Sequence, residues 1–259
     1  MQLIRKLRQR LGTGDPVWGT FLHELGSPGA VHMLAQSGFD YIIIDGEHGT
    51  HDLSTLRHMI ESAHAAGICP LVRAPGLDRG FIHQMLDAGG EGIVFPQLRT
   101  VEEARQAVEF SKYAPMGSRG VHTKRPHTNY NAPDWRTFFD EANRSLLTAI
   151  QIETRGAVDA VDEIAALEGV DCLYLGPSDL STELGCPGRF DDPDVVRAIR
   201  EVAETAQRHG KIAGFQMASP EQADHLMKIG YRALSCSSGL GLLADGAQRV
   251  IERLQQAKA

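Results

Sequence analysis

The stretch GFDYIIIDGEHGTHDLSTLRHMIESAHAAGICPLVR, residues 38–73, decides the fold. It contains two short apolar runs, Tyr41–Asp45 and Cys69–Arg73, and between them a segment with helical periodicity. Ser54 is expected to open this helix and Gly67 to close it. A strand, a helix and a second strand in this order predict one βαβ unit of a parallel sheet.

The same alternation continues along the whole chain. Eight strand and helix units in 259 residues predict an α/β fold, a (β/α)8 TIM barrel that forms a single domain over residues 1–259. A doubly wound sheet is disfavoured because no GxGxxG follows the first strand. The other six apolar runs are Val17–Leu22, Gly92–Gln97, Leu147–Glu153, Cys172–Leu175, Lys211–Gln216 and Ala233–Ser237.

Three further segments carry structural expectations. The basic start of the chain predicts a short amphipathic helix, and Thr100 with Glu103 forms a capping box before another helix. Residues 113–144, rich in Pro, His, Asn and Arg, predict a long loop between the fourth and fifth strands. Such an insertion is either functional or a solvated excursion, and the sequence leaves this open, as it does for His122 and His127.

Composition limits the class of protein. Lys and Arg number 26 against 33 Asp and Glu, a net charge of -7, so a nucleic-acid partner is not expected. No apolar run approaches the ~20 residues of a membrane span, so no membrane association is expected. The four cysteines lack CxxC and zinc-type spacings, and we interpret them as reduced thiols of a cytoplasmic protein.

The carboxyl ends of the strands carry the active site in this type of barrel. Each predicted strand therefore indicates which polar residues are delivered there. They are Asp45, Glu47 and His48 after the second strand, Arg73 on the third, Gln151 and Glu153 on the fifth, Ser178 and Asp179 after the sixth, and Gln216 on the seventh.

Glu153 and Asp179 lie one βα unit apart, so they leave neighbouring strands and can face one ion. Two carboxylates without thiolate or histidine favour a divalent cation such as Mg²⁺ or Mn²⁺. The alternative is two solvated loop acids. Against it stands the turn that begins Gly176, Pro177, Ser178, because a tight turn after a strand exposes backbone N–H groups that can hold a substrate carboxylate.

His48 and Asp45 are the candidate proton-transfer pair. A carboxylate that holds one imidazole nitrogen raises the basicity of the other, which suits a general base, although a structural histidine fits as well. The remaining histidines outside the insertion, His23 among them, are expected at the surface or in packing.

Arg73 ends a buried strand and needs an anionic partner, either a structural carboxylate or a substrate oxygen. Its position favours the substrate oxygen. None of the six lysines ends a strand, and Lys211 begins one, which disfavours a Schiff-base mechanism. A carbanion formed here would therefore need a metal ion as its electron sink.

Six stretches, in this order along the chain, resemble the HpcH/HpaI aldolase family of metal-dependent, class II pyruvate aldolases. They are GFDYIIIDGEHG at 38–49, LVRAP at 71–75, VFPQLRTVEEA at 94–104, YAPMGSRGV at 113–121, QIET at 151–154 and LGPSDLS at 175–181. The resemblance implies a reversible cleavage of 4-hydroxy-2-oxo or 2-keto-3-deoxy acids to pyruvate and an aldehyde. It leaves the aldehyde unidentified, because residues 122–127 and the last strand depart from the family pattern.

The resemblance also implies roles for single residues. Glu153 and Asp179 would bind one divalent ion, Mg²⁺, Mn²⁺ or Co²⁺, and His48 oriented by Asp45 would be the catalytic dyad. Arg73 would hold the keto and enolate oxygen. Gln151 would lie beside the substrate, and the backbone at Gly176, Pro177, Ser178 and Asp179 would take the pyruvate carboxylate. A homohexamer with the last helix exchanged between subunits is expected on the same basis.

Three other interpretations remain open. The same site could decarboxylate a 2-keto dicarboxylate of the oxaloacetate type. Ser237, Ser238, Gly239 and Gly241 could form a phosphate cup after the last strand, where barrels often bind phosphate. The chain could also be a non-catalytic barrel that binds a keto acid.

Overall fold

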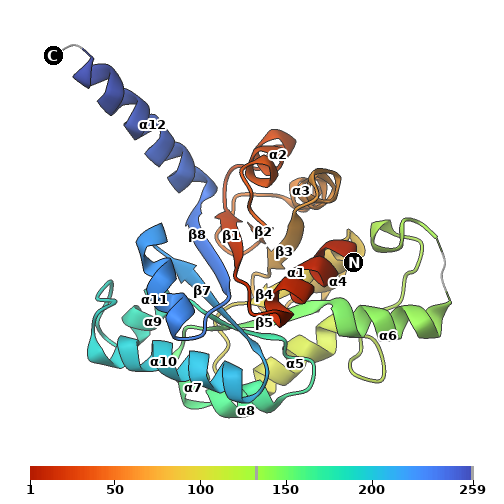
Figure 1. Ribbon diagram of the computed structural model, residues 1–259. Coiled ribbons are helices and arrows are strands. Elements are labelled where there is room, and N and C mark those ends of the chain that lie inside the picture. The colour runs from red at the N-terminus through yellow and green to blue at the C-terminus, as the bar shows by residue number, and fades with distance from the viewer. Residues whose placement is uncertain (132–133, 258–259) are drawn as a thin grey trace.

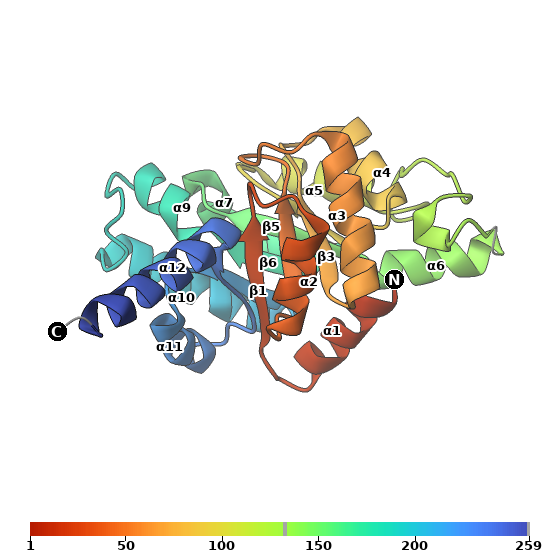
Figure 2. The same cartoon turned by 90° about the horizontal axis from the view of Figure 1, so that it is seen from above.

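The computed structural model describes residues 1–131 and 134–257 of the chain. Eight parallel strands close into a barrel in which each strand pairs with its neighbours in sequence and β1 pairs with β8. Figures 1 and 2 show the helices around it. The strands are β1 (Val17–Leu22), β2 (Tyr41–Asp45), β3 (Cys69–Arg73), β4 (Gly92–Phe95), β5 (Leu147–Ile152), β6 (Cys172–Leu175), β7 (Ile212–Met217) and β8 (Ala233–Ser238).

The predicted TIM barrel is therefore confirmed, with every predicted strand found within two residues of its expected bounds. The helices are α1 (Gln2–Gly12), α2 (Pro28–Gln36), α3 (Leu53–Ala66), α4 (Arg79–Asp87), α5 (Val101–Ser111), α6 (Trp135–Ser145), α7 (Arg155–Asp159), α8 (Val161–Ala166), α9 (Pro177–Glu183), α10 (Pro193–Arg208), α11 (Ala223–Lys228) and α12 (Gly239–Gln256), with 3-10 turns at Pro126–Thr128 and Pro220–Gln222.

Local start and stop signals hold in most places. Thr100 and Glu103 form the expected capping box, and Gly67 ends α3 in the left-handed conformation. The start of α3 differs from the prediction: its N-cap is Asp52, whose carboxylate accepts the Thr55 N–H at 2.7 Å, and Ser54 lies inside the helix. A carboxylate satisfies a free N–H of the first turn as well as a hydroxyl does.

The segment 113–144 is not loop throughout, because α6 occupies about its last third. Asp134 caps α6, and Tyr113 stacks on Phe139 with ring centroids 4.4 Å apart. His127 is buried and its Nδ1 lies 3.2 Å from the backbone oxygen of Asp87, at the end of α4. Since barrel helices run opposite to the strands, this anchor lies at the amino end of the barrel.

The core has two layers. One apolar cluster lies between the sheet and the surrounding helices, and a smaller one fills the barrel interior, where Ile4 and Leu7 of α1 close the amino end. The predicted amphipathic first helix thus plugs the barrel. α12 is different: it projects from the end of β8 away from the barrel in both views (Figures 1 and 2). No helix in the described ranges combines the length and the apolarity that a membrane crossing requires.

Candidate active site

Alternation along the strands decides which side chains face the barrel interior. On β2, Tyr41 and Ile43 belong to the interior cluster and Ile42 and Ile44 to the outer one, so Asp45 continues the interior row. By the same alternation, the last inward-facing side chains of other strands also lie at the carboxyl end of the barrel. These are Phe21 on β1 and His23 directly after it, Arg73 on β3, Gln151 on β5 and Glu153 directly after it, Gln216 on β7 and Ser237 on β8.

A cavity of about 300 Å³ lies at this end and contains most of the predicted site. We name it the catalytic cavity. Its lining residues are Phe21, His23, His48, Arg73, Gln151, Gly176, Pro177, Ser178, Asp179 and Gln216. Residues that lie on or follow β1, β2, β3, β5 and β7 therefore converge here with Gly176 and the start of α9, as the strand-end rule predicts.

Arg73 is held in place by two carboxylates. Its Nε donates to Asp45 Oδ1 at 2.8 Å, its Nη2 bonds to Asp45 Oδ2, and its Nη1 lies 3.1 Å from Glu47 Oε2. Burial would raise the pKa of Asp45, but the hydrogen bond and charge of Arg73 outweigh it and lower that pKa. In the structure the partner of Arg73 is therefore a structural carboxylate, the alternative that the sequence interpretation disfavoured, and a contact with a substrate oxygen stays a prediction. The bonds to Asp45 and Glu47 fix the Arg73 guanidinium at the wall of the cavity and partly neutralise its charge.

The predicted His48–Asp45 pair is not formed in the structure. His48 lines the catalytic cavity with its side chain 63% exposed, and its Nε2 lies 3.8 Å from Glu47 Oε2. The imidazole beside Asp45 is that of His23, whose Nε2 lies 3.2 Å from Asp45 Oδ2. The reason is local: Asp45 is turned toward Arg73, and after it the chain bends at Gly46, where a Cβ would lie 2.7 Å from the Arg73 backbone oxygen.

His23 is therefore a site residue that the sequence interpretation missed. It stacks on Phe21 with ring centroids 5.5 Å apart and lines the catalytic cavity. Burial lowers its pKa, which the charge of Asp45 only partly offsets, so the neutral imidazole is favoured. Its position one residue beyond β1 was the signal available, because the strand-end rule applied to the other strands applies to β1 as well.

Glu153 is a buried carboxylate without a basic side chain bonded to it among the described residues. Its Oε1 accepts the Gln97 backbone N–H at 2.8 Å, and Gln151 Nε2 donates to its Oε2. Burial, together with the charges of Asp179 and Glu47, raises the pKa of Glu153 to about 8, although the Gln97 hydrogen bond and the charge of Arg73 oppose this shift. Glu153, Asp179 and Glu47 therefore concentrate negative charge where Arg73 is the compensating cation.

The turn after β6 lies directly against these groups. A Cβ on Gly176 would overlap Glu153 Oε2 and lie 2.8 Å from Gln151 Nε2, so only glycine fits. Gln151 Oε1 is buried and has no hydrogen-bond partner in the described part of the chain. An acceptor left unsatisfied at a cavity wall favours a ligand or an ordered water at that place.

These groups fit a divalent cation. The donors are carboxylate oxygens, which hard divalent ions prefer. A cation would offset both the burial and the neighbouring negative charges that raise the pKa of Glu153. Within the described ranges, no three His, Cys, Asp or Glu side chains converge as a complete protein ligand set. The residues present therefore correspond to a two-carboxylate site whose remaining positions would be filled by water or substrate oxygens.

Other sequence candidates lie elsewhere. None of the described residues of 113–144 lines the catalytic cavity. Lys211 Nζ donates to the backbone oxygens of Leu167 and Val170 at the amino end of the barrel, as its place before β7 predicted. Ser238 accepts the Gly241 N–H at 3.2 Å and caps α12, so the small residues that the alternative interpretation assigned to a phosphate cup form the start of this helix.

Comparison with known proteins gives consistent results. The family model described as HpcH/HpaI aldolase/citrate lyase matches residues 20–245. A 5-keto-4-deoxy-D-glucarate aldolase of Shigella boydii serotype 18 is 33% identical over 232 residues, which is 90% of each chain. The crystal structure of an HpcH/HpaI aldolase from Desulfitobacterium hafniense DCB-2 superposes with a TM-score of 0.90 at 32% identity, covering 96% of each chain. An HpcH/HpaI aldolase/citrate lyase family protein from Burkholderia cenocepacia J2315 superposes at 0.89 with 30% identity, covering 96% of this chain and 99% of that one.

Proposed function

The chain belongs to the HpcH/HpaI aldolase/citrate lyase family, and from that premise we propose how its site works as a class II pyruvate aldolase. As a carbon–carbon lyase it would reversibly cleave a 4-hydroxy-2-oxo acid to pyruvate and an aldehyde. The observation that carries this proposal is the buried Glu153, whose oxygens are held by the Gln97 N–H and the Gln151 amide, at the end of the barrel where Asp179, Arg73 and Gln151 line one cavity.

Glu153 and Asp179 would hold one divalent cation, Mg²⁺, Mn²⁺ or Co²⁺. When bound, such an ion supplies Lewis acidity that polarises the 2-oxo group of the substrate. The protein itself supplies preorganisation: the backbone N–H of Gln97 and the amide of Gln151 fix both oxygens of Glu153. Gln151 Oε1, which has no partner among the described residues, would then accept a hydrogen bond from water or substrate.

Arg73 would stabilise the negative charge that develops on the oxo oxygen during carbon–carbon cleavage. Its bonds to Asp45 and Glu47, and the Phe21 ring 5.0 Å from its guanidinium carbon, hold the side chain rigid before substrate binds. A charge fixed in advance avoids reorganisation during the reaction. Asp45 is on this view a positioning residue for Arg73. The first backbone N–H groups of α9, at Ser178 and Asp179, would receive the substrate carboxylate.

His48 would move the proton. In cleavage it would take the proton of the 4-hydroxyl group, directly or through one water, and in synthesis the methyl proton of pyruvate, since the same group serves both directions. Its carboxylate neighbour in the structure is Glu47 rather than Asp45.

Proton exchange tests the proposal without knowledge of the aldehyde. NMR in D2O follows the pyruvate methyl signal with chelated enzyme, with and without added Mg²⁺, Mn²⁺ or Co²⁺. We expect metal-dependent exchange that falls about 100-fold in His48→Ala, a usual effect of removing a general base. Absence of exchange with all three metals would contradict the proposal. Release of CO2 from oxaloacetate without any aldol product would favour the decarboxylase instead.

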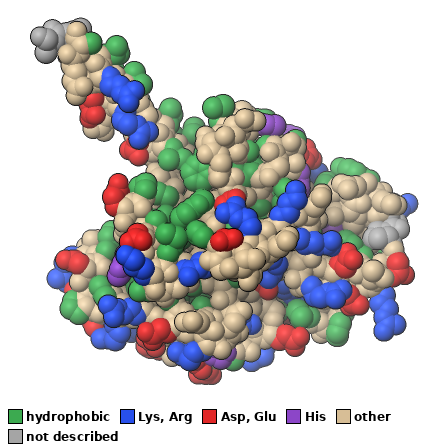
Figure 3. Space-filling model, viewed as in Figure 1, with side chains coloured by type: hydrophobic (Ala, Val, Ile, Leu, Met, Phe, Trp, Pro, Cys, Tyr) green, Lys and Arg blue, Asp and Glu red, His purple; other side chains and the backbone are tan. Residues whose placement is uncertain are grey.

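We also propose a homo-oligomer, a hexamer by resemblance, in which α12 packs on another subunit. α12 has 18 residues, of which Gly239 alone is buried, and five of its large apolar side chains are exposed by 39% to 59%. These are Leu240, Leu243, Val250, Ile251 and Leu254, and Figure 3 shows hydrophobic side chains along this projecting arm. An apolar stripe of this length is typical of an interface. The cytoplasmic location stays a prediction from the cysteine pattern.

A further inference from the structure

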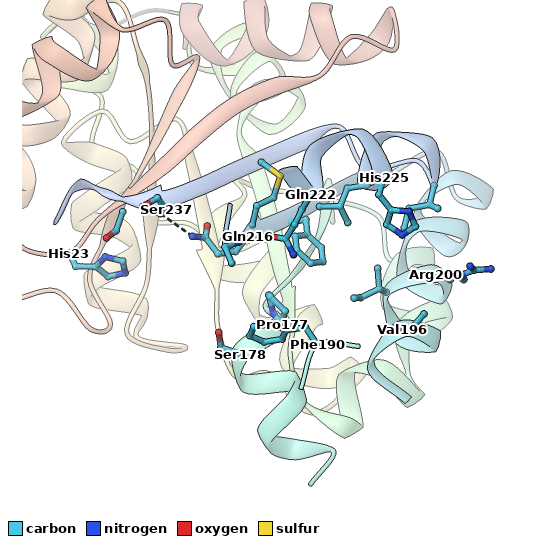
Figure 4. A pocket seen from close by; sticks show the side chains of 17 residues that line it. His23, Pro177, Ser178, Phe190, Val196, Arg200, Gln216, Gln222, His225 and Ser237 are labelled. Carbon is cyan, nitrogen blue, oxygen red and sulfur yellow. Dashed lines mark hydrogen bonds between the residues drawn. The ribbon is translucent and has the colours of Figure 1, made fainter. Parts of the chain in front are cut away.

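A second cavity, of about 490 Å³, adjoins the catalytic cavity. We name it the side chamber. The two cavities share His23, Pro177, Ser178 and Gln216 as lining residues, so they meet over the end of β7. Figure 4 shows His23 and Ser237 at one end of the chamber and Val196, Arg200 and His225 at the other.

The chamber lies outside the barrel strands. Phe215 and Met217 of β7 belong to the outer apolar cluster, and both line the chamber together with α10 and α11. It is therefore a space between the sheet and its covering helices that opens at the mouth of the barrel. A molecule bound in the catalytic cavity could extend into it past Gln216 without leaving the protein.

The walls of the chamber are mostly apolar, and Gln222 is a polar residue among them. The large apolar lining residues are Phe190, Val196, Ile199, Phe215, Met217 and Leu226. At the inner end, the amide of Gln216 is already bonded, since its Nε2 donates to the Ser237 backbone oxygen at 3.0 Å and its Oε1 accepts from Ser235. Arg200 and His225 are exposed and lie at the outer rim.

We propose that the side chamber binds the substituent of the aldehyde substrate and that this substituent is an apolar chain or ring. The inference rests on the proposed aldolase function, because that function places the reacting carbon in the catalytic cavity. A volume of this size with mostly apolar walls is typical of small-molecule sites. A polyhydroxylated substituent would lose its water against these walls and leave hydroxyl groups unpaired.

This proposal assigns to the chain an apolar aldehyde substrate. Its relatives named above are aldolases of a sugar acid, 5-keto-4-deoxy-D-glucarate, which is a different kind of substrate. Chain length is the measurable consequence. Each added methylene buried in the chamber should raise kcat/KM for addition of pyruvate to a straight-chain aldehyde by about fourfold, until the chamber is filled. Acetaldehyde, butanal and hexanal form the test series, and glycolaldehyde and glyceraldehyde are the polar comparison.

Two variants on α10 locate the effect. Ile199→Trp places a large ring in the chamber, whereas Glu201→Trp places the same ring on the exposed side of the same helix. We expect Ile199→Trp to lower kcat/KM for hexanal at least about tenfold, while glycolaldehyde addition and pyruvate exchange stay within about twofold. Glu201→Trp should change none of them. Val196→Phe is a milder second variant if Ile199→Trp does not fold.

A binding readout separates this proposal from the function on which it rests. Saturation-transfer NMR with 1-hexanol should give a binding signal with the wild type and with Glu201→Trp, and added hexanal should reduce this signal. Ile199→Trp should give no such signal. Binding without any pyruvate exchange would leave the chamber in place and overturn the aldolase assignment. Exchange without hexanol binding, or equal kcat/KM for acetaldehyde and hexanal, would overturn the chamber and leave the aldolase.

Discussion

The two ends of the barrel both bury charge, and they differ in whether that charge is balanced. At the amino end, Lys112 Nζ donates to the backbone oxygens of Asn143 and Leu146 and to Asp171, and Asp171 also pairs with Arg8 at 2.8 Å. At the carboxyl end, Glu153 has backbone and amide donors only, and its pKa is raised to about 8.

The difference indicates what each end is for. A buried ion pair with all its hydrogen bonds made is a structural feature, and removing one partner costs stability. A buried carboxylate left without a cation is costly in the folded state and is retained where a ligand supplies the missing charge. The comparison therefore assigns stability to the amino end and chemistry to the carboxyl end, as in other barrels of this fold.

The largest expected effect is on activity at the carboxyl end. Glu153→Gln or Asp179→Asn should lower metal-dependent pyruvate exchange by about 1,000-fold, because a group that stabilises developing charge contributes this much in enzymes. Isothermal titration with Mn²⁺ should show metal binding lost in the same variants. Asp171→Asn, a carboxylate removed at the other end, is the control and should keep metal binding. Full activity of Glu153→Gln after chelation and metal add-back would contradict the assignment of the catalytic chemistry to the unbalanced charge at the carboxyl end.

The next effect is on stability at the amino end. Asp171→Ala should lower the free energy of unfolding by about 3 kcal/mol, because Lys112 and Arg8 lose their carboxylate partner. Urea denaturation followed by circular dichroism measures it. Glu153→Gln in the metal-free protein should instead leave stability equal or raise it, since it removes a carboxylate that is costly to bury. Equal losses of unfolding free energy in Asp171→Ala and Glu153→Gln would mean that the two ends do not differ in how their buried charge affects stability.

The pH dependence of stability sharpens the comparison further. Burial and the charge of Arg119 lower the pKa of His127 to about 4, despite the opposing charge of Asp87. The unfolded chain binds this proton at about pH 6.5, so between pH 6.5 and 4 it holds more protons than the folded protein and stability falls as pH falls. The loss should reach about 3 kcal/mol at pH 4. His127→Gln should reduce this slope in urea denaturation series, and an unchanged slope would contradict the burial of a neutral imidazole.

The sequence was sufficient for the barrel because each strand is a local signal. Every strand is a short apolar run that ends in polar or turn residues, and a strand buried on both faces needs no information from distant residues. One difference is instructive: β4 was expected to reach Gln97 but ends at Phe95. Gln97 has a φ of 58° and turns its N–H toward Glu153, a requirement set by a residue on another strand.

The residues of the site were predictable, but their pairing was not. The strand-end rule selected Arg73, Gln151 and Asp179, which line one cavity. Which imidazole reaches Asp45 depends on how the chain turns after Gly46 and on where β1 ends, and neither follows from spacing along one strand. His48 was chosen because it is near Asp45 in sequence, whereas His23 is near it in space.

The smallest effect separates these two histidines. If His48 is the base and His23 only positions Asp45, then His23→Ala should lower pyruvate exchange by about tenfold or less, the contribution of one hydrogen bond. His58→Ala, an exposed histidine on α3, is the matched control and should change nothing. Because a positioning role acts through Arg73, the loss in His23→Ala should appear without a change in the pH profile of exchange. A loss as large as that of His48→Ala, together with a shifted pH profile, would instead make His23 the base and Asp45 its partner, and the exposed His48 would then be a bystander at the mouth of the cavity.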